Sequence, residues 1–131
     1  MTKNNRIESF SALGEWMLNL DENTLHFINT LSYKNPWYTT DNVLKQFQAL
    51  GNVLNTESLT KWTSDYPDFN SDKIVGLVLA GNLPLVGFHD ILSALIMGFT
   101  AQIKVSSDDA GLTTLVLQRL IEIEPAFNTK I

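Results

Sequence analysis

The stretch from Ile74 to Ser107, IVGLVLAGNLPLVGFHDILSALIMGFTAQIKVSS, constrains the fold of this chain more than any other. Its first residues, Ile74–Ala80, form an apolar run that is rich in β-branched side chains and too short for a buried helix. This pattern predicts a strand buried on both faces, as in a parallel sheet. A helix is predicted over Pro84–Met97, where proline suits the first turn, and a second strand over Ala101–Val105. Strand, helix and strand at this spacing predict a parallel βαβ unit and therefore an α/β protein.

The rest of the sequence is mostly helical in pattern. Apolar residues recur at helical spacing over Arg6–Leu20, and Asp21 or Asn23 is expected to start a second helix. Two more helices are expected before the first strand. One begins at Thr40 or Asp41 and ends at Gly51, and the next begins at Asn55 or Thr56 and closes at Pro67. A last helix is expected after the second strand, over Asp109–Ile123.

Composition excludes several classes of function. The net charge of −5 and the scattered basic residues argue against a nucleic-acid surface. The chain has no cysteine, which rules out disulfides, thiolate zinc sites and a cysteine nucleophile within it. The two histidines are too far apart to suggest a metal site. Polar residues and a proline interrupt the longest apolar stretch, so no membrane span is expected and the predicted location is cytoplasmic.

The corner between the first strand and its helix is the first candidate site. Open α/β sheets bind ligands outside the carboxyl ends of their strands, and Gly81 and Asn82 occupy this corner. Glycine allows another group to approach the backbone, and the asparagine supplies an amide donor. The alternative is ordinary turn chemistry, for which Gly-Asn is common.

Three segments carry a family resemblance. They are Ala80-Gly81-Asn82-Leu83-Pro84-Leu85, Ala94-Leu95-Ile96-Met97-Gly98 and Lys104-Val105-Ser106-Ser107. In order and spacing they resemble the first nucleotide-binding segment of the aldehyde dehydrogenase superfamily. Ala-Gly-Asn in place of Pro-Trp-Asn is more similar to the acyl-CoA reductase (LuxC-like) branch, which the upstream segment Lys34-Asn35-Pro36-Trp37-Tyr38-Thr39 also resembles. Trp37 and Tyr38 of that segment are expected to pack in the core rather than to contact a ligand. The resemblance implies an aldehyde-dehydrogenase-like, Rossmann-type nucleotide-binding domain, of which residues 71–131 are a part. Residues 1–70 are an N-terminal helical segment that precedes it.

The resemblance also implies roles for four residues. Asn82 matches the amide donor to the oxyanion of a thiohemiacetal. Gly81 beside it is assigned to the cofactor site, and the small residues Ala80 and Gly81 leave room for a thioester. Lys104 matches the lysine that binds the adenosine ribose of the cofactor. Ser107 stands where relatives that use NAD often carry Glu, and a neutral hydroxyl there favours NADP(H). The alternatives are a helix-capping role for Asn82 or Ser107 and a solvated strand-end role for Lys104.

These roles predict the N-terminal portion of an NADPH-dependent reductase that converts a fatty acyl-CoA to an aldehyde. The family's acyl-enzyme requires a cysteine, which must lie outside this chain, so the chain alone is expected to be inactive. An NAD-dependent aldehyde dehydrogenase fits Ala80, Gly81 and Ser107 less well. The alternative from another class is a non-catalytic α/β interaction or regulatory module. Two strands leave open sheet edges, which predicts self-association.

Overall fold

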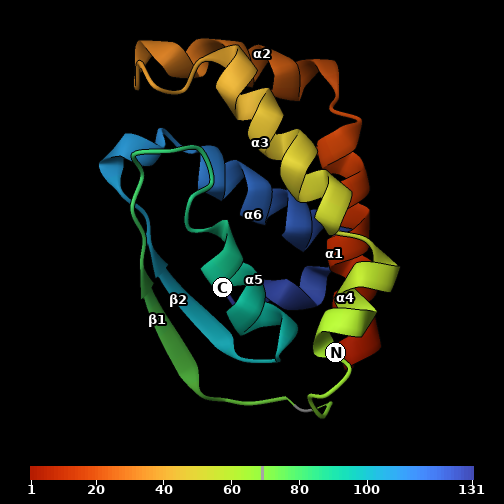
Figure 1. The fold of residues 1–131 in the computed structure, drawn as a ribbon. Coiled ribbons are helices and arrows are strands. Elements are labelled where there is room, and N and C mark those ends of the chain that lie inside the picture. Colours follow the sequence, from red (N-terminus) through yellow and green to blue (C-terminus); the bar gives the residue numbers. More distant parts are fainter. Residues whose placement is uncertain (69) are drawn as a thin grey trace.

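The structure is a computed structural model that describes residues 1–68 and 70–131. Six α-helices and two strands are assigned within this part of the chain, and three short 3-10 turns join or follow them (Figure 1). The helices are α1 (Lys3–Leu18), α2 (Glu22–Thr30), α3 (Thr40–Val53), α4 (Thr56–Thr63), α5 (Phe88–Ile96) and α6 (Leu112–Ile123). The strands are β1 (Ile74–Val78) and β2 (Thr100–Lys104), and the 3-10 turns are η1 (Leu31–Tyr33), η2 (Ser107–Asp109) and η3 (Pro125–Thr129).

Side-chain caps set the starts of the first four helices. Asp21, Thr39 and Asn55 each accept a hydrogen bond from a backbone N–H in the first turn of α2, α3 and α4. The predicted starts of these helices are confirmed to within a residue. Helix α1 begins at Lys3 rather than at the predicted Arg6, because Thr2 and Asn5 form a reciprocal capping box that satisfies two backbone donors.

Helix α1 is the centre of the helical part of the molecule and contacts α3, α4, α5 and α6. Its crossing with α3 is close because a glycine lies on each helix. A Cβ on Gly51 would lie 2.6 Å from Cγ of Leu18 and 2.9 Å from the carbonyl oxygen of Gly14. The prediction that Gly51 ends the third helix is therefore wrong. Helix α3 continues to Val53, and Gly51 serves close packing between the helices.

The core continues from α1 towards the sheet. Phe10 of α1 packs edge-to-face against Phe88 of α5 and Phe127 of η3, with ring centroids 6.4 and 5.7 Å apart. All three rings are fully or almost fully buried. Such aromatic packing contributes about 0.5–1.5 kcal/mol per pair beyond burial alone. The helical segment and the β1–α5–β2 segment consequently share one hydrophobic core.

The two strands pair in parallel, with Ile74 opposite Thr100 and Val78 opposite Lys104, and α5 connects them. The predicted parallel pairing is confirmed. The prediction of a strand buried on both faces is wrong. Val75 and Leu77 face the core, but Ile74 is 63% exposed and Val78 is 85% exposed. Among the described residues, helices cover only one face of the sheet, so the apolar run of β1 is half-buried (Figure 1).

The connection from β1 to α5 differs from the prediction at its helical end. Helix α5 begins at Phe88, four residues after the predicted start at Pro84. Leu85 has φ of +55°, a left-handed conformation that a helix cannot include. Hydrogen bonds from Val86 N–H to the Leu83 carbonyl and from Phe88 N–H to the Leu85 carbonyl instead form successive turns. Residues 79–87 are therefore an irregular loop above the end of β1.

Two kinds of feature are absent from the described residues. No helix there has the length and hydropathy needed to cross a membrane. No group of three or more His, Asp or Glu side chains in that part of the chain is arranged to hold a metal ion.

Candidate functional site

The loop after β1 and the segment after β2 meet at one end of the sheet (Figure 1). Gly81 forms the contact. It is buried, and a Cβ built on it would lie 2.8 Å from Cβ of Ser106 and 2.9 Å from the backbone nitrogen of Asp109. The two segments can approach this closely only because residue 81 has no side chain. The structure thus brings the loop that carries Asn82 into contact with the segment that carries Ser107. The sequence predicts this, because both segments follow the carboxyl ends of parallel strands.

Asn82 projects from this loop as an exposed residue, and its side chain has no hydrogen-bond partner within the described parts of the chain. It does not cap α5. The N-cap position of that helix is Gly87, which supplies no side-chain bond. The capping interpretation of Asn82 is therefore wrong, and its amide is available to a ligand. The oxyanion role stays a prediction.

Lys104 and Ser107 lie at the same end of the sheet. Lys104 is the last residue of β2, it is exposed, and its carbonyl accepts a hydrogen bond from the Leu79 N–H at 3.0 Å. Ser107 opens η2 and is also exposed, but the cap of η2 is Ser106, whose hydroxyl accepts from the Asp108 N–H at 3.2 Å. The capping alternative for Ser107 does not hold, so its hydroxyl is free of that role. These two side chains offer a positive charge and a neutral hydroxyl donor.

Tyr38 reaches this loop from the other side. Its side chain is fully buried, as predicted, and its hydroxyl lies 2.8 Å from the Gly81 carbonyl oxygen and 3.1 Å from the Leu83 carbonyl oxygen. Burial raises the pKa of Tyr38 to about 12, with further contributions from the carboxylates of Asp109 and Asp108. The hydroxyl therefore stays a protonated donor near neutral pH. Sequence reasoning placed Tyr38 in the core but missed this contact.

An open groove of about 600 Å³ borders the loop where it continues past Asn82. Leu83, Pro84 and Val86 form one wall, and the facing wall comes from the region of α3, with Trp37 and Lys45 among its residues. Trp37 is 70% exposed and Leu83 is 53% exposed, so apolar surface is available to a ligand. A single lysine adds positive charge. Sequence reasoning assigned Trp37 to the core and did not find this groove, because its two walls are separated by more than thirty residues along the chain.

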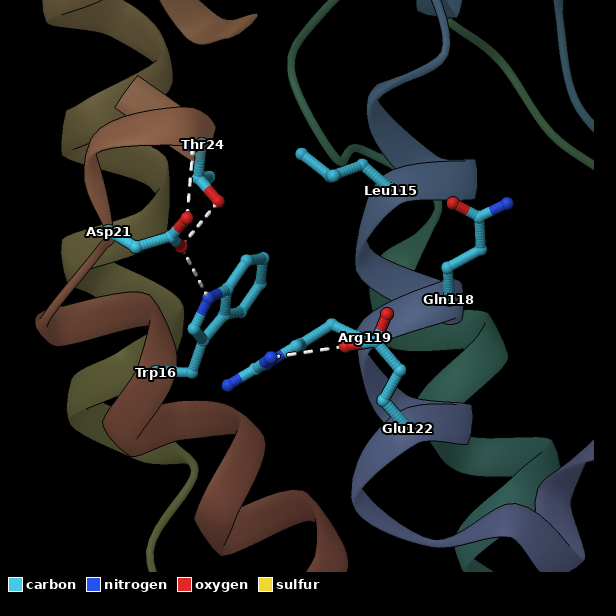
Figure 2. Close-up of a pocket in the computed structure, with 7 residues that line it drawn as sticks. All are labelled: Trp16, Asp21, Thr24, Leu115, Gln118, Arg119 and Glu122. Carbon is cyan, nitrogen blue, oxygen red and sulfur yellow. Dashed lines mark hydrogen bonds and ion pairs between the residues drawn. The ribbon is translucent and has the colours of Figure 1, made fainter. Parts of the chain in front are cut away.

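A smaller cavity of about 170 Å³ lies where α1 and α2 meet α6 (Figure 2). Its charged groups already have partners. Asp21 accepts bonds from the Thr24 hydroxyl at 2.6 Å and the Trp16 indole at 3.4 Å, and the Thr24 bond is the main cause that lowers the pKa of Asp21. Arg119 pairs with Glu122 at 3.0 Å and lies over the Trp16 ring at 5.7 Å. These contacts tie α6 to the α1–α2 corner, so we assign this cavity a structural role.

Comparison of the sequence with known protein families assigns the chain to one of them. The family model described as acyl-CoA reductase (LuxC) matches residues 14–130. The chain belongs to the acyl-CoA reductase (LuxC) family. No curated protein and no solved structure gave a significant match.

The match extends well beyond the segment that carries the resemblance to this family. It includes α2, α3 and α4 as well as β1, α5 and β2, so the helices that pack beside the sheet belong to the same family pattern. This part of a LuxC-family protein therefore comprises a mostly helical body and a small parallel sheet.

Proposed function

We propose that this chain forms part of the NADPH-binding and acyl-transfer site of a fatty acyl-CoA reductase. The observation that carries the proposal is the position of Asn82, Lys104 and Ser107 at the carboxyl ends of the two parallel strands in a LuxC-family chain, where Gly81 packs against Ser106 and Asp109. Open α/β sheets place nucleotides at this end. On this proposal the unit is a portion of a Rossmann-type, aldehyde-dehydrogenase-like domain.

The exposed groups suit NADP(H). A 2′-phosphate on the adenosine ribose would meet the ammonium of Lys104, and the Ser107 hydroxyl is able to donate a hydrogen bond to it. A carboxylate in place of Ser107 would repel the phosphate. When bound, the cofactor supplies the hydride that reduces the acyl group to the aldehyde.

Asn82 is proposed to act on the acyl group. Attack of a cysteine thiolate on the thioester and later hydride transfer both place negative charge on the former carbonyl oxygen. A neutral amide held close to that oxygen stabilises this charge without adding a competing charge. The chain has no cysteine, so the nucleophile belongs to residues outside it. The overall change is acyl-CoA, NADPH and a proton to aldehyde, CoA and NADP⁺.

The groove beside Asn82 is the proposed approach for the acyl thioester. Its apolar residues suit an acyl chain, and Lys45 adds a positive charge that suits the phosphates of CoA. The groove begins at the residue after Asn82, which would place a bound thioester next to the amide.

Ser107→Glu tests the cofactor assignment in an enzyme that contains this chain and its cysteine-bearing remainder. The ratio of kcat/KM with NADPH to kcat/KM with NADH, measured by loss of reduced-cofactor absorbance, is expected to fall by about tenfold or more, equivalent to about 1.4 kcal/mol. Ser58→Glu makes the same charge change at an exposed position in the first turn of α4 and is expected to leave the ratio unchanged. An unchanged ratio in Ser107→Glu would contradict the assignment.

We also propose that the outer edge of β1 pairs with a second copy of the chain. Between the strands, the Thr100 N–H donates to the Lys73 carbonyl and the Leu79 N–H donates to the Lys104 carbonyl. Alternate residues of a strand direct their main-chain groups to opposite sides, so those of Ile74, Gly76 and Val78 face away from β2. No lysine or proline lies within β1 to discourage pairing. The edge of β2 is partly occupied, because Ala101 N–H bonds the Lys130 carbonyl at 2.7 Å. Light scattering at micromolar concentration is expected to show a dimer or larger, and a stable monomer would refute the pairing.

A further inference from the structure

The loop that carries Asn82 is held from outside by the segment between η1 and α3. This loop has no regular secondary structure of its own, and Leu85 within it adopts a left-handed conformation. A non-glycine residue keeps such a conformation only where its surroundings hold it there. The direct restraint closest to Asn82 is the Tyr38 hydroxyl, which shares its one proton between the carbonyl oxygens of Gly81 and Leu83. Tyr38 thus holds the backbone on both sides of Asn82.

The same segment also holds the loop after β2. Asn35 is 7% exposed, and its side-chain amide donates to the Asp108 carbonyl at 2.9 Å while its side-chain oxygen accepts from the Trp37 N–H at 3.0 Å. The second of these bonds fixes the turn that leads into Tyr38. Because Gly81 packs directly on Ser106 and Asp109, the three segments form a closed set of contacts. The motif Asn35-Pro36-Trp37-Tyr38 therefore contacts both loops of the proposed site.

We propose that Tyr38 is a positioning residue for Asn82. It fixes the two carbonyl groups that flank Asn82, so that the backbone from which the side-chain amide projects stands in one place before substrate arrives. Pre-organised donors stabilise developing charge because they need no rearrangement during the reaction. The catalytic meaning of this restraint rests on the proposed function, whereas the restraint itself does not. The raised pKa of Tyr38 supports it, since the hydroxyl remains a donor throughout the neutral pH range.

Nitrogen-15 relaxation on the full 131-residue chain tests the restraint without any need for activity. In the wild type, backbone order parameters of Gly81, Asn82 and Leu83 are expected to be near those of β1, about 0.85. Tyr38→Phe keeps the ring and removes the hydroxyl, and it is expected to lower these three values below about 0.6 while β1 and α1 stay unchanged. Tyr33→Phe is the matched control, because Tyr33 is 89% exposed, and it is expected to change none of them.

Two outcomes would overturn the restraint. One is a wild-type loop that is already mobile, which the wild-type data reveal whether or not Tyr38→Phe folds. The other is a folded Tyr38→Phe chain in which the three order parameters do not fall, or fall no more than those of the rest of the molecule.

Kinetics then separate this proposal from the proposed function. In an enzyme that contains this chain, Tyr38→Phe is expected to lower kcat about tenfold or more with little change in KM for NADPH, because it loosens Asn82 and leaves Lys104 and Ser107 in place. Normal kcat despite a mobile loop would overturn the positioning role. The proposed function fails separately, if replacing Asn82 itself leaves turnover unchanged.

Discussion

The contact at Gly81 gives the sharpest test of how the site is assembled. A methyl group added by Gly81→Ala would stand 2.8 Å from Cβ of Ser106, 3.0 Å from its hydroxyl oxygen and 2.9 Å from the Asp109 nitrogen. The hydroxyl can rotate away, but the Cβ and the backbone nitrogen cannot. The Asp109 N–H also bonds the Ser106 carbonyl at 3.1 Å, so displacement strains that turn. Gly81→Ala must therefore push the two site loops apart.

The expected loss follows from overpacking and chain entropy. Overpacking in a well-packed place costs about 1–3 kcal/mol. Replacing glycine by alanine gains back about 0.4–1 kcal/mol, because it restricts the unfolded chain. The net loss in free energy of unfolding is therefore expected to be up to about 2.6 kcal/mol, with a central value of about 1.3 kcal/mol. Urea unfolding followed by tryptophan fluorescence measures it, since the chain has three tryptophans.

Gly76→Ala is the matched control for this experiment. Gly76 lies in β1 a few residues earlier, and a Cβ built there meets no atom within 4 Å. Alanine in a strand interior is better than glycine by about 0.5–1 kcal/mol, so this variant is expected to be unchanged or slightly more stable. If Gly81→Ala proves as stable as Gly76→Ala, the two loops are not in the contact described here and the argument for a joint site fails.

Two further predictions concern stability. Arg6 is 1% exposed and donates from its guanidinium to the Ile96 carbonyl at 2.9 Å and the Asn70 side-chain oxygen at 3.0 Å, while burial lowers its pKa. Arg6→Met is expected to lower the urea midpoint by the equivalent of about 1–3 kcal/mol, because the buried Ile96 carbonyl loses its donor, and a loss below about 0.5 kcal/mol would refute this. Tyr38 has a pKa of about 12 in the folded chain against 10.0 without burial, so the unfolded chain loses this proton first as pH rises. The free energy of unfolding is therefore expected to decline as pH rises from about 10 to about 12, and Tyr38 adds no pH dependence below that range. Tyr38→Phe is expected to flatten the decline. An identical decline in the wild type and the variant would contradict the raised pKa of Tyr38.

The sequence predicts the topology well because the relevant signals are local. The apolar run of β1, the breaker at Pro84 and the apolar second strand were enough for a parallel β–α–β unit, which the structure shows. Capping residues such as Asp21 and Asn55 located the helix starts for the same reason. Each of these signals acts over a few residues, and the contacts that satisfy it lie within its own segment.

The errors arise where distant segments decide the outcome. Gly51 has the local pattern of a helix end, but the approach of Gly14 and Leu18 on α1 keeps it inside α3. Proline at position 84 suits a helix start, yet the left-handed Leu85 delays the helix to Phe88. An apolar run does not reveal whether one face of its strand or both are covered. These features depend on packing partners that no local pattern specifies.

In the candidate site, too, the sequence predicts the features with a local signal and misses those that depend on distant segments. The resemblance located Gly81, Asn82, Lys104 and Ser107, and the structure places them around one end of the sheet. It gave no indication that Ser106 rather than Ser107 caps η2, nor that the Tyr38 hydroxyl reaches the backbone beside Asn82. The upstream motif that contains Tyr38 was the available signal. Its role depends on a contact across 43 residues of sequence.

Kinetics of Asn82→Asp in an enzyme that contains this chain test the central claim most directly. Asn82 is exposed and caps no helix, so the substitution is expected to leave the free energy of unfolding within about 0.5 kcal/mol of the wild type. An oxyanion donor replaced by a carboxylate places negative charge where negative charge develops. We therefore predict that kcat and kcat/KM for the acyl-CoA fall together by about 10²-fold or more, with the KM for NADPH nearly unchanged. Near-normal turnover in this single variant would remove Asn82 from the chemistry and contradict the account.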